Sequence, residues 1–193
     1  MNRTVERGQV SFSDARRTVL DENERLLESL DDEGWEHFGE VLSQGRAVFV
    51  IGSGRSGLAA QMAAMRLMHL GLRVHVAGEV TAPAIGAGDV LLAVSGSGTT
   101  AAVVQAAEVA RGVGAIVVAV TTAAQSPLAQ RCDHALVLAA ADKQDHSTSV
   151  TRQYAGSLFE QSLLLALDAQ FHMLWRTTSL TPEQLWTRHA NIG

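Results

Sequence analysis

Two glycine-rich turns in this chain offer the backbone amides and hydroxyl groups that can bind a phosphate. One of them, VSGSGTT from Val94 to Thr100, carries two glycines, two serines, two threonines and no charge. Where a strand gives way to a helix, such a turn aims N–H groups and the positive end of the helix dipole at an anion. A capping role for Ser and Thr, with glycine permitting the turn, is the alternative. The predicted phosphate-binding residues are Ser95, Gly96, Ser97, Gly98, Thr99 and Thr100.

The other turn, IGSGRSG at 51–57, has the spacing G-x-G-x-x-G of dinucleotide-binding loops. Glu79 follows roughly twenty residues later, where a ribose-binding carboxylate is expected, so a nicotinamide enzyme is one hypothesis. Two such turns on adjacent strand ends instead favour a small phosphorylated ligand held between them, with Ser53, Arg55 and Ser56 among its contacts. Glu79 would then act as a second acid, or it would position the hydroxyl groups of a sugar. As alternatives, Arg55 is a solvated turn residue and Glu79 a polar residue that closes a strand.

These turns need a sheet to position them. Five short apolar runs rich in β-branched residues indicate strands, and helical stretches lie between most of them, notably Leu58 to Leu70 and Ala101 to Arg111. This alternation is typical of a parallel sheet covered on both faces. We predict a three-layer α/β/α sandwich with a five-stranded parallel sheet of flavodoxin-like type, with ligands at the carboxyl ends of the strands. The runs are AVFVIG (47–52), RVHVAG (73–78), DVLLAVSG (89–96), AIVVAV (115–120) and HALVLAA (134–140).

Further helices are expected at both ends of a single domain over residues 1–193. In the N-terminal region, 1–44, apolar residues recur at three- and four-residue steps, with a break at DDEG (31–34). The α/β core at 45–177 ends in a long helix from about Gly156. A C-terminal helix at 181–193 opens at TPEQ, where Thr181 and Gln184 form a capping box and proline suits the first turn.

The composition argues against several classes of function. A formal net charge of −5 disfavours a nucleic-acid partner, which needs a basic patch. The single cysteine, Cys132, cannot form an internal disulfide, and MNRTVERGQV lacks the apolar core of a signal peptide, so a cytoplasmic location is expected. The apolar stretch from Leu158 to Trp175 is interrupted by charged and polar residues that a membrane-spanning helix seldom tolerates. No membrane partner is expected, and a helix buried on most sides, as inside an oligomer, is the better account.

Several motifs together resemble one family of sugar-phosphate enzymes. They are GSGRSG (52–57), AMRLMHLGLRVHVAGE (64–79), SGSGTT (95–100), QYAGSLFEQ (153–161) and RHANI (188–192). From about residue 47 to 192 the chain is similar to the 6-phospho-3-hexuloisomerases of the sugar isomerase (SIS) domain superfamily. The resemblance implies interconversion of D-arabino-3-hexulose 6-phosphate and D-fructose 6-phosphate, the second step of formaldehyde fixation in the ribulose monophosphate pathway. It implies no cofactor and no metal, and a homotetramer.

The resemblance also implies that Ser56 and the turn at 95–100 contact the substrate and that Glu160 accepts a proton. Moving a carbonyl from C3 to C2 takes a proton from C2, passes through a C2–C3 enediolate and reprotonates C3, so one carboxylate over the open-chain sugar is sufficient. Without the resemblance, SLFE (157–160) is first a capping box, with Glu160 at the third helical position in a local role. The two roles are compatible if that helical turn faces the strand ends.

His189 is the second catalytic candidate, because a histidine can shuttle a proton near neutral pH. It would act in its own site or in that of a neighbouring subunit; the alternative is a surface residue that stabilises a helix end. The remaining histidines are assigned to structure, surface or packing: His37, His69, His75, His134, His146 and His172.

Two other functions stay open. A sugar-phosphate sensor would use the same domain, although regulators of this class usually carry a DNA-binding domain and no basic helical segment precedes residue 47. A nicotinamide enzyme would need a substrate domain for which the chain leaves little room, and the turn rich in serine and threonine disfavours it.

Overall fold

A parallel sheet forms the centre of the computed structural model, which describes residues 10–141, 150–154 and 156–192. All four strand pairs are parallel, and the strand order is β2-β1-β3-β4-β5. Four strands fall inside the predicted apolar runs, and β4 extends one residue beyond its run to Thr121, so the predicted sheet is confirmed. The strands are β1 (Val48–Gly52), β2 (Val74–Val76), β3 (Val90–Val94), β4 (Ile116–Thr121) and β5 (His134–Val137).

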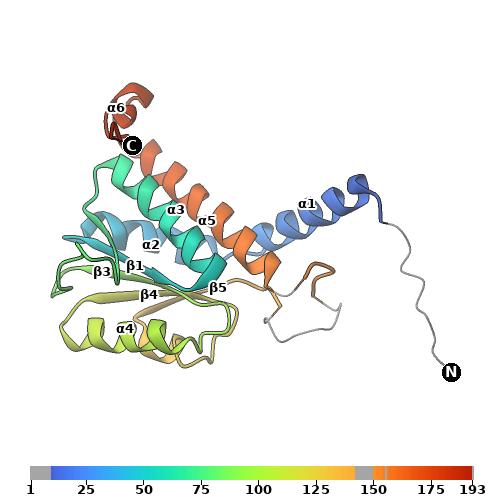
Figure 1. Ribbon diagram of the computed structural model, residues 1–193, viewed down its shortest axis with the longest axis horizontal. Coiled ribbons are helices and arrows are strands. Elements are labelled where there is room, and N and C mark those ends of the chain that lie inside the picture. The colour runs from blue at the N-terminus through green and yellow to red at the C-terminus, as the bar shows by residue number, and fades with distance from the viewer. Residues whose placement is uncertain (1–9, 142–149, 155, 193) are drawn as a thin grey trace.

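Helices cover both faces of this sheet (Figure 1). On one face, α3 (Gly54–Leu70) and α5 (Ser157–Arg176) lie side by side, with α2 (Asp32–Gln44) and part of α1 (Phe12–Glu28) packed around them. On the other face lie α4 (Ala101–Gly112) and the 3-10 turn η1 (Ala129–Arg131). The three-layer α/β/α sandwich predicted from the alternation of strands and helices is therefore confirmed.

The alternation of side chains along each strand divides the core in two. In β1, Val48 and Val50 pack into the layer of α3 and α5, whereas Phe49 packs into the layer of α4. In β3, Leu92 and Leu91 divide in the same way. Every residue of β3 is buried, as expected of a central strand covered on both faces.

The strand order reverses between β1 and β3, and this reversal sets the place of the site. β2 lies on the outer side of β1, while β3, β4 and β5 follow one another on the opposite side. In open α/β sheets the crevice outside the carboxyl ends at such a point binds ligands. Gly52, the last residue of β1, is the register partner of Val94, the last residue of β3. Both glycine-rich turns therefore leave the sheet next to each other.

The terminal helices differ in extent from the prediction. The break between α1 and α2 lies at Ser29–Asp31, slightly before the predicted one. The predicted capping box is present at α6 (Pro182–Trp186), but this helix is much shorter than 181–193. It ends early because Arg188 and His189 turn back onto α3: the Arg188 guanidinium donates to the His69 carbonyl at 2.8 Å. Residues 1–9 of the predicted N-terminal region and Gly193 lie outside the described residues.

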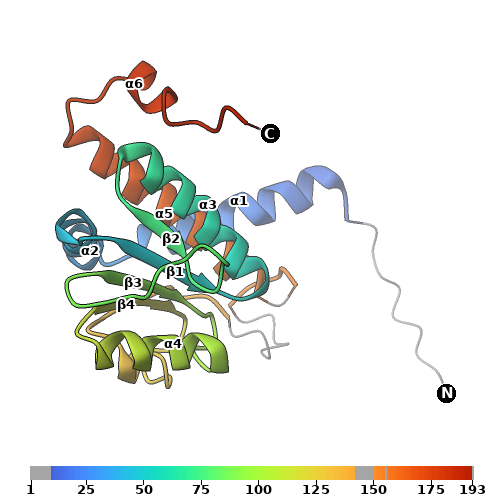
Figure 2. The ribbon, with the colours of Figure 1, turned by 60° about the vertical axis from the view of Figure 1, so that its left-hand side comes forward.

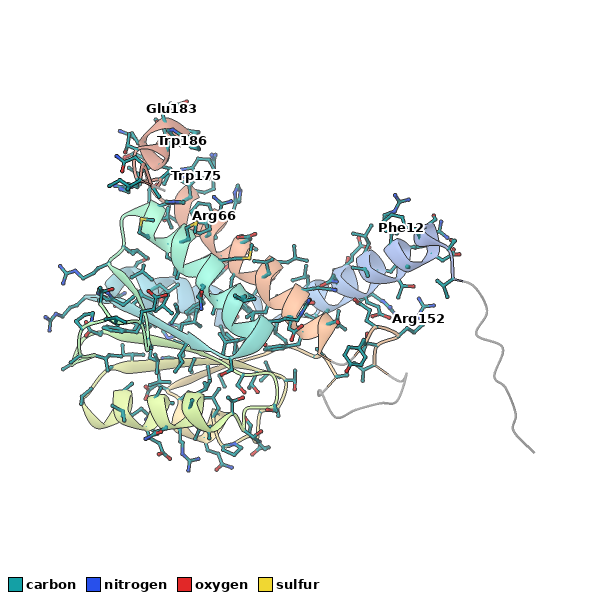
Figure 3. The ribbon with its side chains drawn as sticks, in the orientation of Figure 1. Phe12, Arg66, Arg152, Trp175, Glu183 and Trp186 are labelled. Atoms are coloured by element: carbon teal, nitrogen blue, oxygen red, sulfur yellow. The ribbon has the colours of Figure 1, made fainter. Side chains whose placement is uncertain are left out.

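Helix α1 reaches away from the body of the protein, as Figures 1 and 2 show from two directions. Its inner half is anchored, because Glu22, Asn23 and Leu26 are buried. At its outer end Phe12 is 81% exposed (Figure 3). Only the inner half of α1 therefore contributes to the core.

The apolar stretch from Leu158 to Trp175 forms most of α5, and its polar side chains do not all face solvent. Glu160, Ser162 and Gln170 are buried among the apolar residues of this helix. In the ranges 10–141, 150–154 and 156–192, no helix combines the length and apolar character needed to cross a membrane.

Candidate phosphate and proton-transfer site

The turn after β3 contacts the end of β4 and the segment that follows it through its carbonyl groups. The Gly96 carbonyl accepts hydrogen bonds from the Thr121 and Thr122 hydroxyls at 3.0 and 2.9 Å. The Gly98 carbonyl accepts one from the amide of Leu128 at 3.0 Å. Since the peptide group is planar and trans, the N–H that follows each carbonyl points the opposite way. The Ser97 amide is thereby directed away from β4, whereas the Thr99 amide already donates to Ser97 Oγ at 3.3 Å.

The hydroxyl groups of the same turn pair with each other. Ser95 Oγ lies 2.9 Å from Thr100 Oγ1, and Ser97 Oγ lies 2.9 Å from Thr99 Oγ1. Thr100 is the N-cap residue of α4, yet its side chain makes no capping hydrogen bond. The capping alternative therefore does not apply to Thr100, and the first amides of α4 have neither an acceptor inside the helix nor a side-chain cap.

The turn after β1 is shaped by close contact between backbones. A Cβ atom on Gly57 would lie 2.6 Å from the Gly52 carbonyl oxygen, so any side chain there would push α3 away from β1. Gly54 has a φ of +58°, in the left-handed region that favours glycine. Ser53 is the N-cap of α3, and like Thr100 it makes no capping hydrogen bond. The glycine spacing has a steric explanation here, and it leaves a second helix N-terminus open.

Ser56 contributes a buried hydroxyl to this turn. Its side chain is 2% exposed, and its Oγ has no hydrogen-bond partner among the described residues. Leaving a buried hydroxyl unpaired costs about 1–3 kcal/mol, so such a group is expected to meet a partner in the working protein. Ser56 is the group of the site that most directly points to a ligand.

One polar cavity of about 160 Å³ lies between the two turns. Sites for whole small molecules usually measure about 300–1,000 Å³, so this cavity has the size for one phosphate group. The structure thus brings together predicted residues from both turns, whereas Arg55, Gly98, Thr99 and Glu79 do not line the cavity. The lining residues are Ser53, Gly54, Ser56, Val94, Ser95, Gly96, Ser97 and Thr100.

Arg55 and Glu160 form an ion pair that joins the first turns of α3 and α5. The Arg55 Nε atom lies 2.5 Å from Glu160 Oε2. The Arg55 side chain is 67% exposed and that of Glu160 only 7%. In the chain, Arg55 stands between Gly54 and Ser56, which both line the cavity. The arrangement combines an anion-binding pocket, a cation and a buried carboxylate.

Glu160 is not part of a capping box, and that sequence-based alternative is wrong. Helix α5 begins at Ser157, with Gly156 as N-cap in the left-handed region at a φ of +74°. Ser157 is therefore already the first helical residue, and Glu160 is the fourth. A glycine N-cap has no side chain that could reach the helix amides.

Phe159 connects α5 with the phosphate-binding turn. A Cβ atom on Gly96 would lie 3.2 Å from Cδ1 of Phe159, so the turn and the ring are in close contact. Phe159 itself is 1% exposed. This contact, which the sequence did not single out, sets the spacing between the predicted phosphate pocket and the helix that carries Glu160.

His189 lies at the far end of α3 from Arg55. Its ring stacks on that of His69, with centroids 3.9 Å apart, and His69 is the second-last residue of α3. With a rise of about 1.5 Å per residue, His69 and Arg55 are roughly 20 Å apart along the helix. The structure does not bring His189 and Glu160 of one chain together. Burial, with His189 and Arg66 nearby, lowers the pKa of His69 and favours its neutral form.

Glu79 lies in the exposed turn after β2, where its amide donates to the Val76 carbonyl at 3.2 Å. This places it at the carboxyl edge of the sheet, beyond β1. In the part of the chain that the structure describes, no three side chains of His, Cys, Asp or Glu gather as a metal site requires.

Comparisons with known proteins agree with this architecture. The model of the family described as SIS domain matches residues 41–165. The chain is 56% identical over 153 residues to a 3-hexulose-6-phosphate isomerase of Mycobacterium gastri, covering 79% of this chain and 76% of that protein. It is 34% identical over 175 residues to a 3-hexulose-6-phosphate isomerase of Bacillus subtilis, covering 90% and 95%. A solved structure from Methanococcus jannaschii, interpreted as inferring the function of 3-hexulose-6-phosphate isomerase, matches with a TM-score of 0.80 and 25% identity, covering 92% of this chain and 98% of that one.

Proposed function

The chain belongs to the SIS domain family, and from that premise we propose how it works as a 3-hexulose-6-phosphate isomerase of the ribulose monophosphate pathway. This is the activity also called 6-phospho-3-hexuloisomerase. One observation carries the proposed mechanism: an uncharged phosphate-sized cavity lies next to a buried carboxylate, Glu160, that is paired with Arg55.

The phosphate of the sugar binds in the cavity between the two turns. Amides at the N-termini of α3 and α4 and the helix dipoles attract the dianion, and hydroxyl groups, that of Ser56 first among them, donate to its oxygens. Arg55 adds a positive charge at the rim. The cavity is too small for the six-carbon chain, so the sugar extends out of it towards Glu160.

Glu160 carries the proton between C2 and C3. Its carboxylate removes the proton from C2, the C–H electrons form the C2–C3 double bond, and the former C3 carbonyl becomes an enediolate oxygen. When the C2 oxygen passes its proton to the C3 oxygen and forms the new carbonyl, C3 takes its proton back from Glu160. Arg55 stabilises the negative charge on the enediolate oxygens. Glu79 lies at the same edge of the sheet and would position the sugar hydroxyls.

The working protein is proposed to be a cytoplasmic homo-oligomer, a tetramer, in which His189 serves the site of another copy. Its distance from Glu160 in its own chain supports this assignment. So do Leu58, Met62 and Met65, which are 60%, 52% and 58% exposed along one side of α3. Exposed apolar side chains of this kind are typical of surfaces that another protein covers.

An assay of product formation tests the function. The 3-hexulose 6-phosphate is made in situ by an aldolase, and the purified protein is expected to convert it to fructose 6-phosphate. Binding of the sugar phosphate without turnover would instead identify a sensor, and saturable NAD binding would revive the nicotinamide hypothesis.

A further inference from the structure

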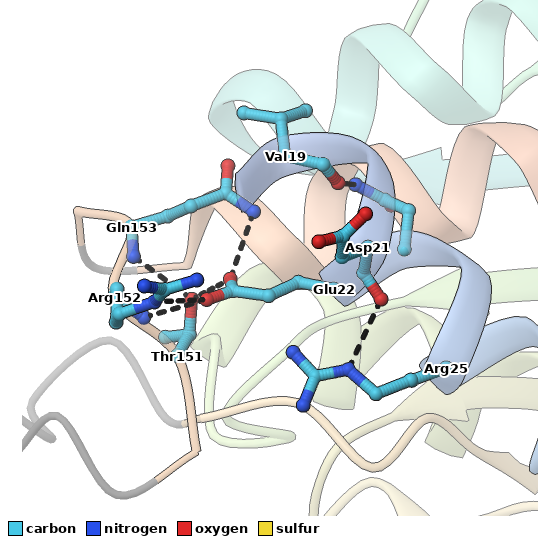
Figure 4. A network of polar contacts seen from close by, with 8 residues as sticks. Val19, Asp21, Glu22, Arg25, Thr151, Arg152 and Gln153 are labelled. Carbon is cyan, nitrogen blue, oxygen red and sulfur yellow. Dashed lines mark hydrogen bonds and ion pairs between the residues drawn. The ribbon is translucent and has the colours of Figure 1, made fainter. Parts of the chain in front are cut away.

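A buried carboxylate on α1 holds the segment that leads into α5 (Figure 4). Glu22 Oε2 accepts hydrogen bonds from the Thr151 hydroxyl at 2.6 Å and from Gln153 Nε2 at 3.1 Å. Glu22 Oε1 accepts one from the Arg152 amide at 2.9 Å. Three consecutive residues just before α5 are therefore tied to one side chain that is more than 120 positions earlier in the chain.

The next residue of α1, Asn23, holds the two residues that follow Glu160. Asn23 Nδ2 donates to Gln161 Oε1 at 2.7 Å, and Asn23 Oδ1 accepts from the Ser162 hydroxyl at 2.8 Å. Gln161 Nε2 donates in turn to Gln153 Oε1 at 2.9 Å. These bonds join both contact regions into one network, which we call the α1 clamp: Glu22, Asn23, Thr151, Gln153, Gln161 and Ser162.

The polar groups of the α1 clamp are paired, and most of its residues are buried. Glu22, Asn23, Thr151 and Ser162 are all at most 5% exposed. Burial acts to raise the pKa of Glu22, but hydrogen bonds from Thr151, Arg152 and Gln153 outweigh it and hold this pKa below its usual range. Glu22 is thus a carboxylate at neutral pH, and hydrogen bonds to a charged acceptor are the stronger kind.

We propose that the α1 clamp sets the position of Glu160, and that Glu22 and Asn23 are positioning residues for its proton transfer. The hydrogen bonds from Glu22 and Asn23 hold the chain at 151–153, before Glu160, and at 161–162, after it. Between them the helix starts at Gly156, which has no side chain to fix that start. A shift of about 1 Å in a reacting group can cost on the order of 100-fold in rate, so the anchoring of this turn is decisive.

This inference rests on the proposed function, so its test uses the isomerase assay with wild type as reference. Two variants weaken the clamp from opposite sides: Glu22→Gln removes the charge, and Ser162→Ala removes one hydroxyl that contacts Asn23. Val41→Ala is the matched control, because Val41 is a buried residue of α2 that is not part of the clamp. For each protein we would measure kcat, KM, the inhibition constant of inorganic phosphate and the melting temperature.

The expected effects differ between kcat, which reports on the proton transfer, and phosphate inhibition, which reports on the binding pocket. We expect kcat to fall about ten-fold or more in Glu22→Gln and about three-fold or more in Ser162→Ala, as a misplaced base requires. Inhibition by inorganic phosphate stays within about two-fold of wild type, because the cavity shares no residue with the clamp. Val41→Ala is expected to have a lower melting temperature than wild type and an unchanged kcat at temperatures where it is folded.

Three outcomes would overturn the inference: a wild-type kcat in the folded clamp variants, an equal loss of kcat in Val41→Ala at a matched folded fraction, or a loss confined to KM and phosphate inhibition. If Glu22→Gln does not fold, Ser162→Ala decides the question by the same measurements. A wild-type protein without isomerase activity would reject the proposed function and this inference together. An active wild type with fully active clamp variants rejects the inference alone.

Discussion

The ring of Phe159 packs against Gly96, so the helix that carries Glu160 rests directly on the phosphate-binding turn. Phe159 and Glu160 are neighbours in the first turn of α5, and Gly96 lines the cavity. This contact between a ring and a backbone therefore limits how closely the helix that carries Glu160 can approach the phosphate-binding turn.

Glu160→Gln is expected to bind the sugar phosphate and to lose most of its turnover. The amide keeps the size of the side chain but cannot accept the C2 proton, and a general acid–base group contributes about 10²–10⁴-fold. Steady-state kinetics on 3-hexulose 6-phosphate, with inorganic phosphate inhibition as the control for an intact pocket, measure the effect. Full activity in this variant would remove Glu160 from the mechanism.

Gly96→Ala is expected to lower kcat/KM by about ten-fold, because a Cβ 3.2 Å from the Phe159 ring must push α5 away from the turn. Gly112→Ala is the matched control, since a Cβ on Gly112 would meet nothing within 4 Å. The two variants are compared by kinetics and thermal unfolding. Equal activities of both would contradict the role given to the Gly96–Phe159 contact.

Ser56→Ala is expected to affect stability and binding in opposite directions. Removing a buried hydroxyl that has no partner among the described residues leaves the free protein as stable as wild type or more stable, by up to about 1 kcal/mol. The same change weakens phosphate binding about ten-fold, since a charge-assisted hydrogen bond is lost. Thermal unfolding without ligand and calorimetric titration with inorganic phosphate give the two values. Unchanged phosphate affinity would place the anion elsewhere.

His189 is expected to act in the site of another copy, and mixed oligomers test this. Glu160→Gln and His189→Ala are each expected to be nearly inactive alone. Refolded together, they form some sites with both residues intact, so activity returns to about a quarter of wild type if the two residues come from different chains. No recovery, with mixed oligomers verified by mass, would place both residues in one chain or leave His189 without a role.

The stability contributed by Glu22 is expected to depend on pH. Its folded pKa is lowered, so its contribution is present above the unfolded value of about 4.3 and is lost as the pH falls through the folded value. At pH 7 wild type is expected to exceed Glu22→Gln by about 1.5–3 kcal/mol in free energy of unfolding. At about pH 3 the difference shrinks. Urea unfolding of both proteins at the two pH values measures it, and a constant difference would contradict the pKa shift.

Local patterns in the sequence were sufficient for the sheet and the two turns. The five strands are short apolar runs that end at glycines or polar residues, and parallel pairing follows from the helices between them. Gly52 and Gly57 were recognised by their spacing, although the structure gives them a steric role in the contact of β1 with α3. Both turns meet because the strand order reverses between β1 and β3.

The start of α5 could not be predicted in this way. SLFE matches a capping box, but the helix begins at Ser157 with Gly156 as its N-cap, and the residues shortly before it bind a partner far away in the chain. Glu22 binds residues 151–153, and Gly156 then adopts the left-handed conformation that starts the helix at Ser157. Glu22 itself lies in the polar run DENE, where nothing marks it as buried. The stacking of His189 on His69 likewise arises only in the folded chain, and the catalytic role of His189 stays a prediction.

The register pairing of Gly52 with Val94 has a consequence for fluctuations of the fold. Both phosphate-binding turns originate from interior strands, the parts that open last when a protein unfolds locally, whereas α1 is anchored by only one half. The phosphate site is therefore expected to stay intact when peripheral helices unfold locally. A partly opened molecule can then still sequester its sugar phosphate without converting it.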